Sequence, residues 1–406
     1  MSVVTKLPSR MPIEPRSSVD AVVSVPGSKS LTNRSVLAAA LAEGESHLEG
    51  PLDSDDTVAM REALALMGVS IETHPDEWVV HGTGGRLAAP SEPLLVGNAG
   101  TAMRFLAAAT ALADGPSILD GTERMRERPI GDLVHALGEL GAGIETPHST
   151  DCPPLRMAGG GLPGGHATID ASQSSQYVSA VLLAAPYAER DITLAFSDGV
   201  LVSRPYVDLT LQLMEDFGAE ACWRDGGDAI WVRAGQPYNA RRYAIEPDAS
   251  SAVYPLCAAA IAGGRVRVVG IPQGSRQSDL GIVDLLERMG CGVIRGDAFV
   301  EVQGPSEGLQ TLGEVDMNDL PDAALAYAVV ALFANGPTTI TNVANLRIKE
   351  TDRLTALETE LQRLGAGAVA TEDSIEVRPA PLHGALIETY EDHRNAMSHS
   401  LARWRV

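Results

Sequence analysis

An Ala-rich apolar helix recurs along this chain at intervals of 71 to 75 residues. Each copy opens with a small polar or charged residue, runs through an apolar stretch and ends near a Gly-containing turn before a β-like segment. The copies begin at Ser30, Thr101, Ser175, Ser250, Asp322 and His393. Because self-similarity at a fixed period is the mark of a repeat architecture, we expect one structural unit to be built several times over.

A second, amphipathic helix alternates with the first and ends in an apolar residue followed by glycine. The glycines lie 73, 77, 72 and 75 residues apart, at Gly68, Gly141, Gly218, Gly290 and Gly365. A glycine just past the last apolar position is typical of a left-handed helix C-terminus. Each unit therefore reads as strand, helix, strand, helix and short strands, which predicts an α/β (α+β) protein of six units, three per domain. A solenoid is the alternative, although its repeats usually span about 20–50 residues.

The sixth unit opens at His393, and the sequence stops at Val406. Its second helix is therefore expected to lie beyond the last residue. We expect a frayed C-terminus in which Ala396, Met397 and Leu401 are more exposed than their counterparts in the other units.

Charge and composition exclude several classes of protein. The chain has 406 residues, with 31 Lys and Arg against 53 Asp and Glu, a net charge of −22. Nucleic acids and anionic membranes need a basic face, so neither is an expected partner. Apolar runs such as residues 323–334 are shorter than the ~18 residues of a membrane span. Four scattered cysteines without C-x-x-C spacing favour neither disulfides nor a zinc site. We expect a soluble cytoplasmic protein.

The strongest motif is Pro-Gly-Ser-Lys-Ser-Leu-Thr-Asn-Arg at residues 26–34. A Pro-Gly turn leads into a helix whose first turn carries Lys29, Ser30 and Arg34. Free N–H groups and the dipole at a helix N-terminus attract an anion, and the two cations add to the attraction. The spacing is not that of a nucleotide P-loop. A capped helix with two solvated cations is the alternative reading.

Further helix openings in the first half carry groups that bind anions. Residues 97–104 combine Gly100 with Asn98 and Thr101, which can hydrogen-bond ligand oxygens. Residues 124–129 place three arginines, including Arg128, at an expected helix start, with Pro129 as its first residue. Hydroxyl, amide and Arg groups follow at Ser174, Ser175, Gln176, Ser203, Arg204 and Tyr206. A structural turn or an ordinary N-cap is the alternative for each of these openings.

The second half adds carboxylates to this pattern. Asp322 falls in the first turn of an apolar helix, where N-capping is the alternative role. Around Asn345, the chain reads Asn-Leu-Arg-Ile-Lys-Glu-Thr-Asp-Arg, which predicts that Lys349 and Arg353 are an i, i+4 pair on one helix face with Glu350 between them. Nearby cations would keep Glu350 ionised as a proton acceptor. Asp392-His393-Arg394 opens the last unit with another cation.

An acidic chain has thus placed Lys and Arg at the starts of helices in most of its units. If these helix ends converge, the site suits a substrate with several phosphate or carboxylate charges. There is no H-x-x-x-H pair and no His/Cys cluster in the sequence, so no metal site is expected.

Eight motifs give the sequence a resemblance to a known family. The motifs P-G-S-K-S-x-T-N-R, G-N-A-G-T-A-M-R, R-M-x-x-R-P-I, S-S-Q, S-R-P-Y, D-M-N-x-x-P-D-A, N-x-R-x-K-E-T-D-R and D-H-R occur between Pro26 and Met397. In order and spacing they resemble the 3-phosphoshikimate 1-carboxyvinyltransferase (EPSP synthase) family of the shikimate pathway, which supplies chorismate for aromatic amino acid biosynthesis.

The resemblance implies a fold and a division into domains. The family fold is a two-domain inside-out α/β barrel made of six βαβαββ repeats, which agrees with the six units found here, the sixth truncated. The first domain would span residues 27–245. The second would combine residues 1–26 with 246–406, so that two crossovers form the hinge.

The resemblance also implies the substrates and their ligands. Shikimate 3-phosphate would be held by Lys29, Ser30, Arg34, Ser174, Ser175, Gln176, Ser203, Tyr206, Asp322, Asn345 and Lys349. Phosphoenolpyruvate would be held by Lys29, Asn98, Gly100, Thr101, Arg128, Gln176, Arg353 and Arg394. The 5-hydroxyl would add to the enolpyruvate and phosphate would then leave, with Asp322, Glu350 and Lys29 as the catalytic residues. No cofactor is implied, and a monomer is expected.

Two alternatives differ from this reading. UDP-N-acetylglucosamine enolpyruvyltransferase shares the fold, but it usually carries a reactive Cys in the loop at residues 121–128, which here contains none. A protein that binds shikimate 3-phosphate without turnover is the other, because the family's C-terminal K-T-[FW]-P segment does not occur in this sequence. If the protein does turn over, the missing Lys of that segment leads us to expect near-normal binding of shikimate 3-phosphate and a raised KM for phosphoenolpyruvate.

Overall fold

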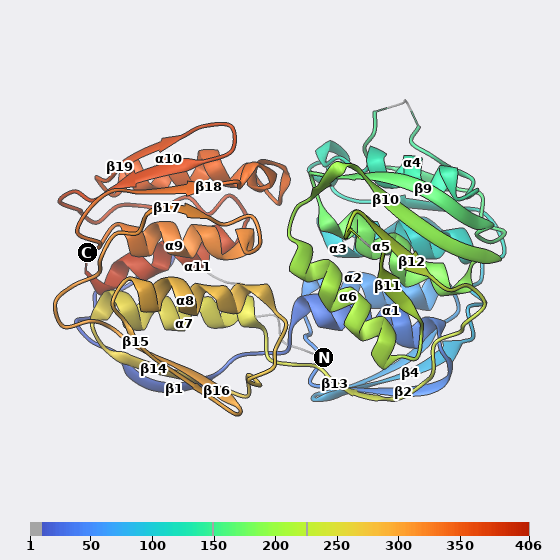
Figure 1. Cartoon of the computed structure of the whole chain (residues 1–406), viewed down its shortest axis with the longest axis horizontal. Coiled ribbons are helices and arrows are strands. Elements are labelled where there is room, and N and C mark those ends of the chain that lie inside the picture. The colour runs from blue at the N-terminus through green and yellow to red at the C-terminus, as the bar shows by residue number, and fades with distance from the viewer. Residues whose placement is uncertain (1–9, 148–149, 225, 406) are drawn as a thin grey trace.

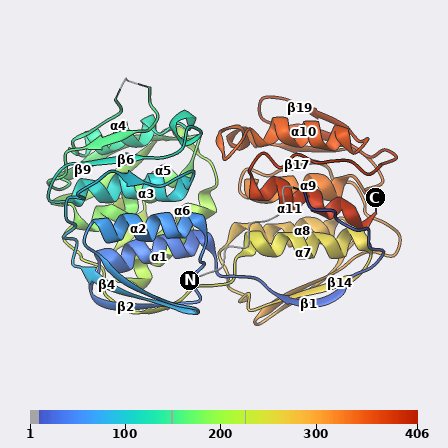
Figure 2. The same ribbon diagram turned by 180° about the vertical axis from the view of Figure 1, so that it is seen from behind.

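Two lobes, each with its own hydrophobic core, make up the protein (Figures 1 and 2). The computed structural model describes residues 10–147, 150–224 and 226–405. One core runs from Leu31 to Ile245 and defines the amino lobe. The other runs from Ala252 to Ala402 and defines the carboxy lobe. The fold is therefore a two-domain mixed α/β fold, as the sequence predicted.

The amino lobe contains helices α1 to α6 and three four-stranded sheets, ordered β13-β2-β4-β3, β5-β6-β8-β7 and β11-β12-β10-β9. Its helices and 3-10 turns are α1 (Lys29–Leu41), α2 (Asp55–Leu66), α3 (Gly100–Ala109), η1 (Thr110–Leu112), η2 (Met125–Glu127), α4 (Gly131–Glu139), α5 (Ser175–Ala184), η3 (Ala185–Tyr187) and α6 (Arg204–Asp216). Its strands are β2 (Glu43–Glu49), β3 (Ser70–His74), β4 (Glu77–Thr83), β5 (Leu94–Leu95), β6 (Ser117–Asp120), β7 (Ile144–Glu145), β8 (Leu155–Met157), β9 (Gly164–Ala171), β10 (Arg190–Leu201), β11 (Ala221–Trp223), β12 (Ala229–Val232) and β13 (Arg242–Ala244).

The carboxy lobe contains α7 to α11 and two four-stranded sheets, ordered β1-β14-β16-β15 and β17-β18-β20-β19. Its helices and 3-10 turns are α7 (Ala249–Ala262), η4 (Ser278–Gly281), α8 (Ile282–Arg288), η5 (Pro321–Ala323), α9 (Ala324–Ala331), η6 (Ala344–Ile348), α10 (Arg353–Arg363), α11 (His393–Ser400) and η7 (Leu401–Trp404). Its strands are β1 (Asp20–Ser24), β14 (Arg265–Val269), β15 (Gly292–Gly296), β16 (Phe299–Gln303), β17 (Gly313–Asp316), β18 (Thr338–Thr341), β19 (Gly367–Ala370) and β20 (Ile375–Arg378). Within the described ranges, no helix is both long and apolar enough to span a membrane.

All five sheets share one topology. In each, one outer pair of strands is parallel and the other two pairs are antiparallel, as in β1-β14-β16-β15. In the sheet β11-β12-β10-β9 the parallel pair stands last, between β10 and β9. The Ala-rich helices lie inside the lobes and the sheets lie outside (Figure 1). Every residue of α3 and of α9 is buried, as expected for helices that are apolar on all sides.

The predicted glycine C-termini of the second helices are confirmed. The five glycines after α2, α4, α6, α8 and α10 all have φ between +87° and +99°. That conformation is open to glycine without the Cβ clash that other residues meet, so each glycine ends its helix and releases the chain toward the next strand.

The two lobes are joined where the chain crosses twice between them. Gly27 and Pro247 pair as an isolated antiparallel bridge, and Ser28 N–H donates to the carbonyl of Glu246 at 2.8 Å. A Cβ on Gly27 would lie 1.9 Å from the carbonyl oxygen of Gly50, so only glycine fits this crossing. The crossings place the N-terminal strand β1 in the carboxy lobe, next to β14.

The C-terminal segment differs in part from the expectation. Met397 is 46% exposed and Ala396 is half-buried, but Leu401 is only 4% exposed and belongs to the carboxy-lobe core. Helix α11 continues directly into η7, and the expectation of greater exposure is wrong for Leu401. Leu401 is buried because η7 packs against α7 and α9.

Candidate active site

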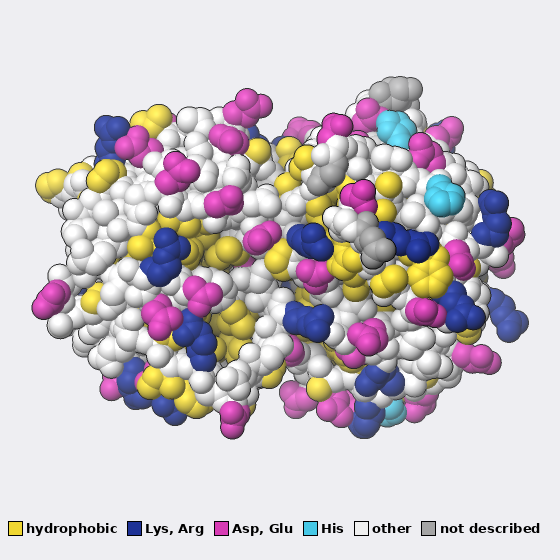
Figure 3. Space-filling model, in the orientation of Figure 1, with side chains coloured by type: hydrophobic (Ala, Val, Ile, Leu, Met, Phe, Trp, Pro, Cys, Tyr) yellow, Lys and Arg dark blue, Asp and Glu magenta, His cyan; other side chains and the backbone are white. Residues whose placement is uncertain are grey.

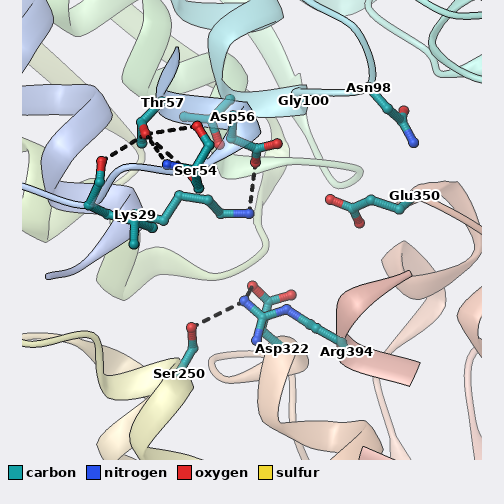
Figure 4. Close-up of polar contacts among 12 residues, drawn as sticks. Lys29, Ser54, Asp56, Thr57, Asn98, Gly100, Ser250, Asp322, Glu350 and Arg394 are labelled. Carbon is teal, nitrogen blue, oxygen red and sulfur yellow. Dashed lines mark hydrogen bonds and ion pairs between the residues drawn. The ribbon is translucent and has the colours of Figure 1, made fainter. Parts of the chain in front are cut away.

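A cavity between the lobes gathers polar side chains from both of them. About 800 Å³ of space free of protein atoms lies in and in front of it, open solvent included. Figure 4 shows Lys29 and Glu350 reaching from opposite lobes toward the same space. The cavity is lined by Lys29, Ser30, Arg34, Asp56, Gly100, Thr101, Arg128, Ser174, Ser175, Gln176, Ser203, Tyr206, Asp248, Ser250, Pro321, Asp322, Asn345, Lys349, Glu350, Arg353 and Arg394.

Lys29 stands at the first residue of α1 and forms an ion pair with Asp56. Ser28 caps the helix, its hydroxyl accepting from Leu31 N–H. Lys29 Nζ lies 2.9 Å from Asp56 Oδ2, at the start of α2. Burial lowers the pKa of Lys29, but Asp56 and Glu350 outweigh burial and leave that pKa above its ordinary value. Lys29 is therefore a cation at neutral pH that is held toward the cavity.

Arg128 is held at the cavity wall by the loop before α3. Its Nη1 donates to the backbone carbonyl of Asn98 at 2.9 Å and to the Asn98 side-chain oxygen at 3.2 Å. A Cβ on Gly100 would lie 2.4 Å from Arg128 Nη2, so glycine is needed here for the guanidinium to pack. Burial, together with Arg104, lowers the pKa of Arg128 to about 10, which still leaves it charged at neutral pH.

The N-termini of α5 and α6 supply neutral hydrogen-bonding groups. Ser174 caps α5 by accepting from Gln176 N–H, and the Gln176 amide donates to Thr101 at 3.3 Å. Ser203 precedes α6 with φ +52°, and its hydroxyl donates to the carbonyl of Asn318 in the carboxy lobe at 3.2 Å. Hydroxyls and free N–H groups at two helix starts suit the oxygens of a phosphate.

Arg34 lines the cavity, but its donors are largely used within the amino lobe. Its guanidinium donates to Thr210 Oγ1 at 2.8 Å, to the Ser30 carbonyl at 3.1 Å, and to Ser179 Oγ and the Tyr206 carbonyl at 3.3 Å each. Arg34 is only 2% exposed, and burial lowers its pKa to about 10. It therefore ties α1 to α5 and α6 besides contributing charge to the cavity wall.

In the carboxy lobe, Asp322 forms ion pairs with two arginines. Its carboxylate lies 3.2 Å from Arg353 Nη1 and 2.8 Å from Arg394 Nη2. Arg394 also donates to Ser250 at 3.2 Å (Figure 4). Burial raises the pKa of Asp322, but Arg394, Lys349 and Arg353 reverse this and lower that pKa below its ordinary value. Asp322 is therefore ionised and fixed in direction.

Glu350 lies next to Arg353 and faces the cations of the amino lobe. Its carboxylate is 2.7 Å from Arg353 Nη2. Burial raises its pKa, while Arg353, Arg128 and Lys29 lower that pKa well below the ordinary value. Arg353 is in turn anchored by Asp392, 2.8 Å away, and both of these side chains are at most 1% exposed.

The structure corrects the predicted placement of Lys349. Helix α10 begins only at Arg353, with Asp352 as its N-cap, so Lys349 and Arg353 are not an i, i+4 pair on one helix. Lys349 and Glu350 instead lie in the non-helical segment between η6 and α10. Burial lowers the pKa of Lys349, against the opposing effect of Asp322.

The segment at residues 124–129 also departs from the prediction. Residues Met125–Glu127 form a single 3-10 turn, and α4 begins at Gly131, so Pro129 is not its first residue. The carbonyl of Pro129 accepts from Arg104 and from Tyr177. The turn leaves Arg124 free to reach the other lobe, where its Nη2 donates to the carbonyls of Arg347 and Lys349.

Comparison with known proteins decides the family. The family profile described as EPSP synthase (3-phosphoshikimate 1-carboxyvinyltransferase) matches residues 13–406. The chain belongs to the EPSP synthase family. A 3-phosphoshikimate 1-carboxyvinyltransferase of Serratia proteamaculans is 48% identical over 396 residues, covering 96% of this chain and 91% of the relative. One from Trichormus variabilis is 44% identical over 382 residues, covering 94% and 89%.

A solved structure agrees with the family assignment. EPSP synthase from Acinetobacter baumannii superposes with a TM-score of 0.77 and 28% identity, covering 97% of this chain and 91% of that one. All the residues that the EPSP synthase resemblance implied line the cavity except Asn98, whose side chain instead accepts from Arg128.

Four residues of the cavity were not among the predicted site residues: Asp56, Asp248, Ser250 and Pro321. Asp56 reads in the sequence as an acidic residue in a first helical turn, a common structural feature. Asp248 caps α7 by accepting from Ser251 N–H, and Ser250 was noted only as a helix start. Asp56, Asp248 and Ser250 lie at helix starts, as most of the predicted site residues do. That shared position was the one sequence signal that could have added them to the predicted site.

Proposed function

We propose that this protein transfers the enolpyruvyl group of phosphoenolpyruvate to the 5-hydroxyl of shikimate 3-phosphate, releasing phosphate and 5-enolpyruvylshikimate 3-phosphate. Membership of the EPSP synthase family supports this activity, as do curated relatives named 3-phosphoshikimate 1-carboxyvinyltransferase. The observation that carries the proposal is the cavity itself. A chain of net charge −22 gathers cationic side chains from both lobes there, with the carboxylates of Asp322 and Glu350 beside them and those of Asp56 and Asp248 also in the lining.

The two substrates would occupy neighbouring parts of this cavity. For shikimate 3-phosphate, the proposed ligands are Lys29, Ser30, Arg34, Ser174, Ser175, Gln176, Ser203, Tyr206, Asp322, Asn345 and Lys349. For phosphoenolpyruvate, they are Lys29, Gly100, Thr101, Arg128, Gln176, Arg353 and Arg394, with Asn98 acting through Arg128. Lys29 belongs to both groups, which suits a residue that stands where the substrates meet.

The proposed chemistry is addition followed by elimination. The 5-hydroxyl loses its proton and its oxygen bonds to C2 of the enolpyruvate, while C3 gains a proton. The intermediate then loses phosphate and one proton from C3. Asp322, Glu350 and Lys29 are the proposed catalytic residues. Both carboxylates are kept ionised by neighbouring cations, and the negative charge of bound phosphoenolpyruvate would raise the Glu350 pKa, so that this group could gain a proton and give it to C3.

The alternatives receive less support. The names of relatives such as those from Serratia and Trichormus refer to 3-phosphoshikimate, which does not favour a UDP-sugar as the acceptor. Binding without turnover is not favoured by those names either. Both alternatives are separated from the main proposal by the experiment below.

The finer description of the fold is part of the same proposal. We assign the domains to residues 27–245 and to residues 1–26 plus 246–406, with the boundaries at the crossing of Gly27 and Pro247. The shared topology of five sheets and the glycine-terminated helices support repeats of βαβαββ type arranged as inside-out α/β barrels. Charges of both signs are interspersed on the face drawn in Figure 3. The monomeric state and cytoplasmic location remain predictions.

The test is phosphate release by the purified chain. With both shikimate 3-phosphate and phosphoenolpyruvate present, we expect phosphate and an enolpyruvyl product of the corresponding mass in equal amounts. Omission of either substrate should abolish release. Release only with UDP-N-acetylglucosamine as acceptor would favour the other transferase, and calorimetric binding of shikimate 3-phosphate without release would favour the non-catalytic alternative.

A further inference from the structure

A hydrogen bond between the lobes joins a cavity residue to a buried acid behind it. The hydroxyl of Tyr206, in α6, donates to Oδ2 of Asp279, in η4, at 2.6 Å. Tyr206 lines the cavity, whereas Asp279 does not and is only 3% exposed. The second carboxylate oxygen of Asp279 has no hydrogen-bond partner among the described residues.

Tyr206 has one hydrogen to give and two possible acceptors. A phenolic hydroxyl carries a single donor hydrogen, and an ionised carboxylate can only accept. While Asp279 is ionised, it takes that hydrogen, so Tyr206 cannot donate to an anionic substrate in the cavity. A protonated Asp279 could instead donate to the Tyr206 oxygen and leave the Tyr206 hydrogen for the substrate.

The groups around Asp279 favour its protonated form. The groups that face Asp279 are Tyr206 from α6, Asp322 from η5, Arg394 from α11 and Asp248 before α7. Burial first, and then the charge of Asp322, raises the pKa of Asp279 to about 6, against the effect of Arg394. Helix α8 also packs on η4, but its acids Asp284 and Glu287 pair with Arg295 at the surface. An added anion in the cavity would raise that pKa further.

We propose that Asp279 is a positioning residue that takes up a proton when shikimate 3-phosphate binds and thereby turns the Tyr206 hydroxyl toward the substrate. The proton comes from the solvent and forms an O–H bond on the Asp279 carboxylate, and none passes to the substrate. The inference rests on the proposed function, because it assumes that Tyr206 contacts shikimate 3-phosphate.

Calorimetry of shikimate 3-phosphate binding to the full chain tests the proton uptake. Titrations at pH 7.5 in buffers of different ionisation enthalpy give the number of protons bound. In Asp279→Asn, the amide N–H can donate permanently to the Tyr206 oxygen, as the protonated acid would. We expect this variant to take up about one proton fewer than the wild type and to bind at least as tightly at pH 8.

The pH dependence separates this role from a structural one. The ratio of the wild-type Kd to the Asp279→Asn Kd should rise about fiftyfold between pH 6 and pH 8, because only the wild type must acquire the proton. Titration of the ligand itself cancels in this ratio. Asp284→Asn, which removes an exposed carboxylate of the same lobe, is the matched control and should behave as the wild type does.

Tyr206→Phe provides a second variant, which also serves if Asp279→Asn does not fold. It should take up less of a proton than the wild type, because Asp279 without its Tyr206 donor is already more protonated in the free chain, and it should bind shikimate 3-phosphate more weakly. Equal proton uptake in the wild type and the variants, with a constant Kd ratio, would overturn this inference and leave the proposed function standing. Failure of the wild type to bind shikimate 3-phosphate at any pH would overturn both.

Discussion

Arg124 of the amino lobe donates a hydrogen bond of 3.1 Å to the backbone carbonyl of Lys349 in the carboxy lobe, 225 residues further along the chain. The same nitrogen donates to the carbonyl of Arg347 at 3.4 Å. These bonds hold the non-helical segment that carries Lys349 and Glu350 against the amino lobe. The position of Glu350, a proposed catalytic carboxylate, therefore depends on this contact between the lobes.

Removal of this contact should lower catalytic efficiency. In Arg124→Ala, two hydrogen bonds worth about 1 kcal/mol each are lost, so kcat/KM should fall by about tenfold or more. Steady-state kinetics of phosphate release measure it. Arg126→Ala is the control, because Arg126 pairs with Asp120 inside the amino lobe and, among the described residues, makes no hydrogen bond to the other lobe. Equal effects of the two substitutions would remove Arg124 from this role.

Glu350→Gln should separate binding from chemistry. The amide keeps the shape of the side chain but cannot accept a proton, so kcat should fall on the order of 10² or more. The affinity for shikimate 3-phosphate, measured by calorimetry, should change little. Glu372→Gln, at an exposed position of the same lobe, should leave both quantities as they are. Unaltered turnover in Glu350→Gln would exclude this residue from the mechanism.

Loss of one partner of the buried ion pair between Arg353 and Asp392 should lower the free energy of unfolding strongly. Asp392→Ala leaves the Arg353 guanidinium buried without its 2.8 Å partner and also removes the N-cap of α11, so unfolding should become easier by about 3–5 kcal/mol. Urea unfolding gives the value. Asp352→Ala removes the cap of α10 at a less buried position and should cost about 1 kcal/mol. Similar losses in the two variants would contradict the importance of burial here.

Stability should depend on pH through His399. This imidazole is 4% exposed, and burial lowers its pKa below the ordinary value, so the folded chain resists its protonation. In the unfolded chain the group binds a proton once the pH falls below about 6.5. The unfolded state then holds more protons, and the free energy of unfolding decreases as the pH falls, by up to about 1.4 kcal/mol per unit for this group.

The variant His399→Leu should flatten that dependence. Urea unfolding at pH values between 5 and 8 compares it with His166→Leu, which removes an exposed imidazole. The wild type and His166→Leu should show the same slope, and His399→Leu a smaller one. Parallel slopes in all three proteins would mean that His399 is not the group responsible.

Much of the fold could be predicted from the sequence because its signals are local. Apolar helices without a polar face must be buried, and glycines such as Gly68 and Gly218 adopt the left-handed conformation that their position predicted. The boundary before Arg353 was missed, although the capping sequence Asp352-x-x-Thr355 marks it, and Asp352 does accept from Thr355 N–H.

The parts of the site that sequence did not predict depend on packing between distant segments. Asp56 is an ordinary first-turn acid until α1 and α2 pack and bring it to Lys29. Likewise, nothing in the local sequence of Arg124 or Asp279 indicates that each bonds across the two lobes. Such contacts arise only when the tertiary structure closes, so neither residue was singled out for a role.

The place of β1 has a consequence for the order in which the chain can assemble. Asp20 pairs with Arg265, so the first strand must wait for some 245 residues of chain before its neighbour exists. The amino lobe, which is built entirely from the intervening residues, can form its own core during that time. Once this core has formed, the two ends of the lobe at Gly27 and Pro247 already lie together. Pairing β1 with β14 then carries little further entropic cost of loop closure. During synthesis on the ribosome, the amino lobe should therefore fold before the carboxy lobe. Its folding then holds β1 close to the place where β14 will pair with it.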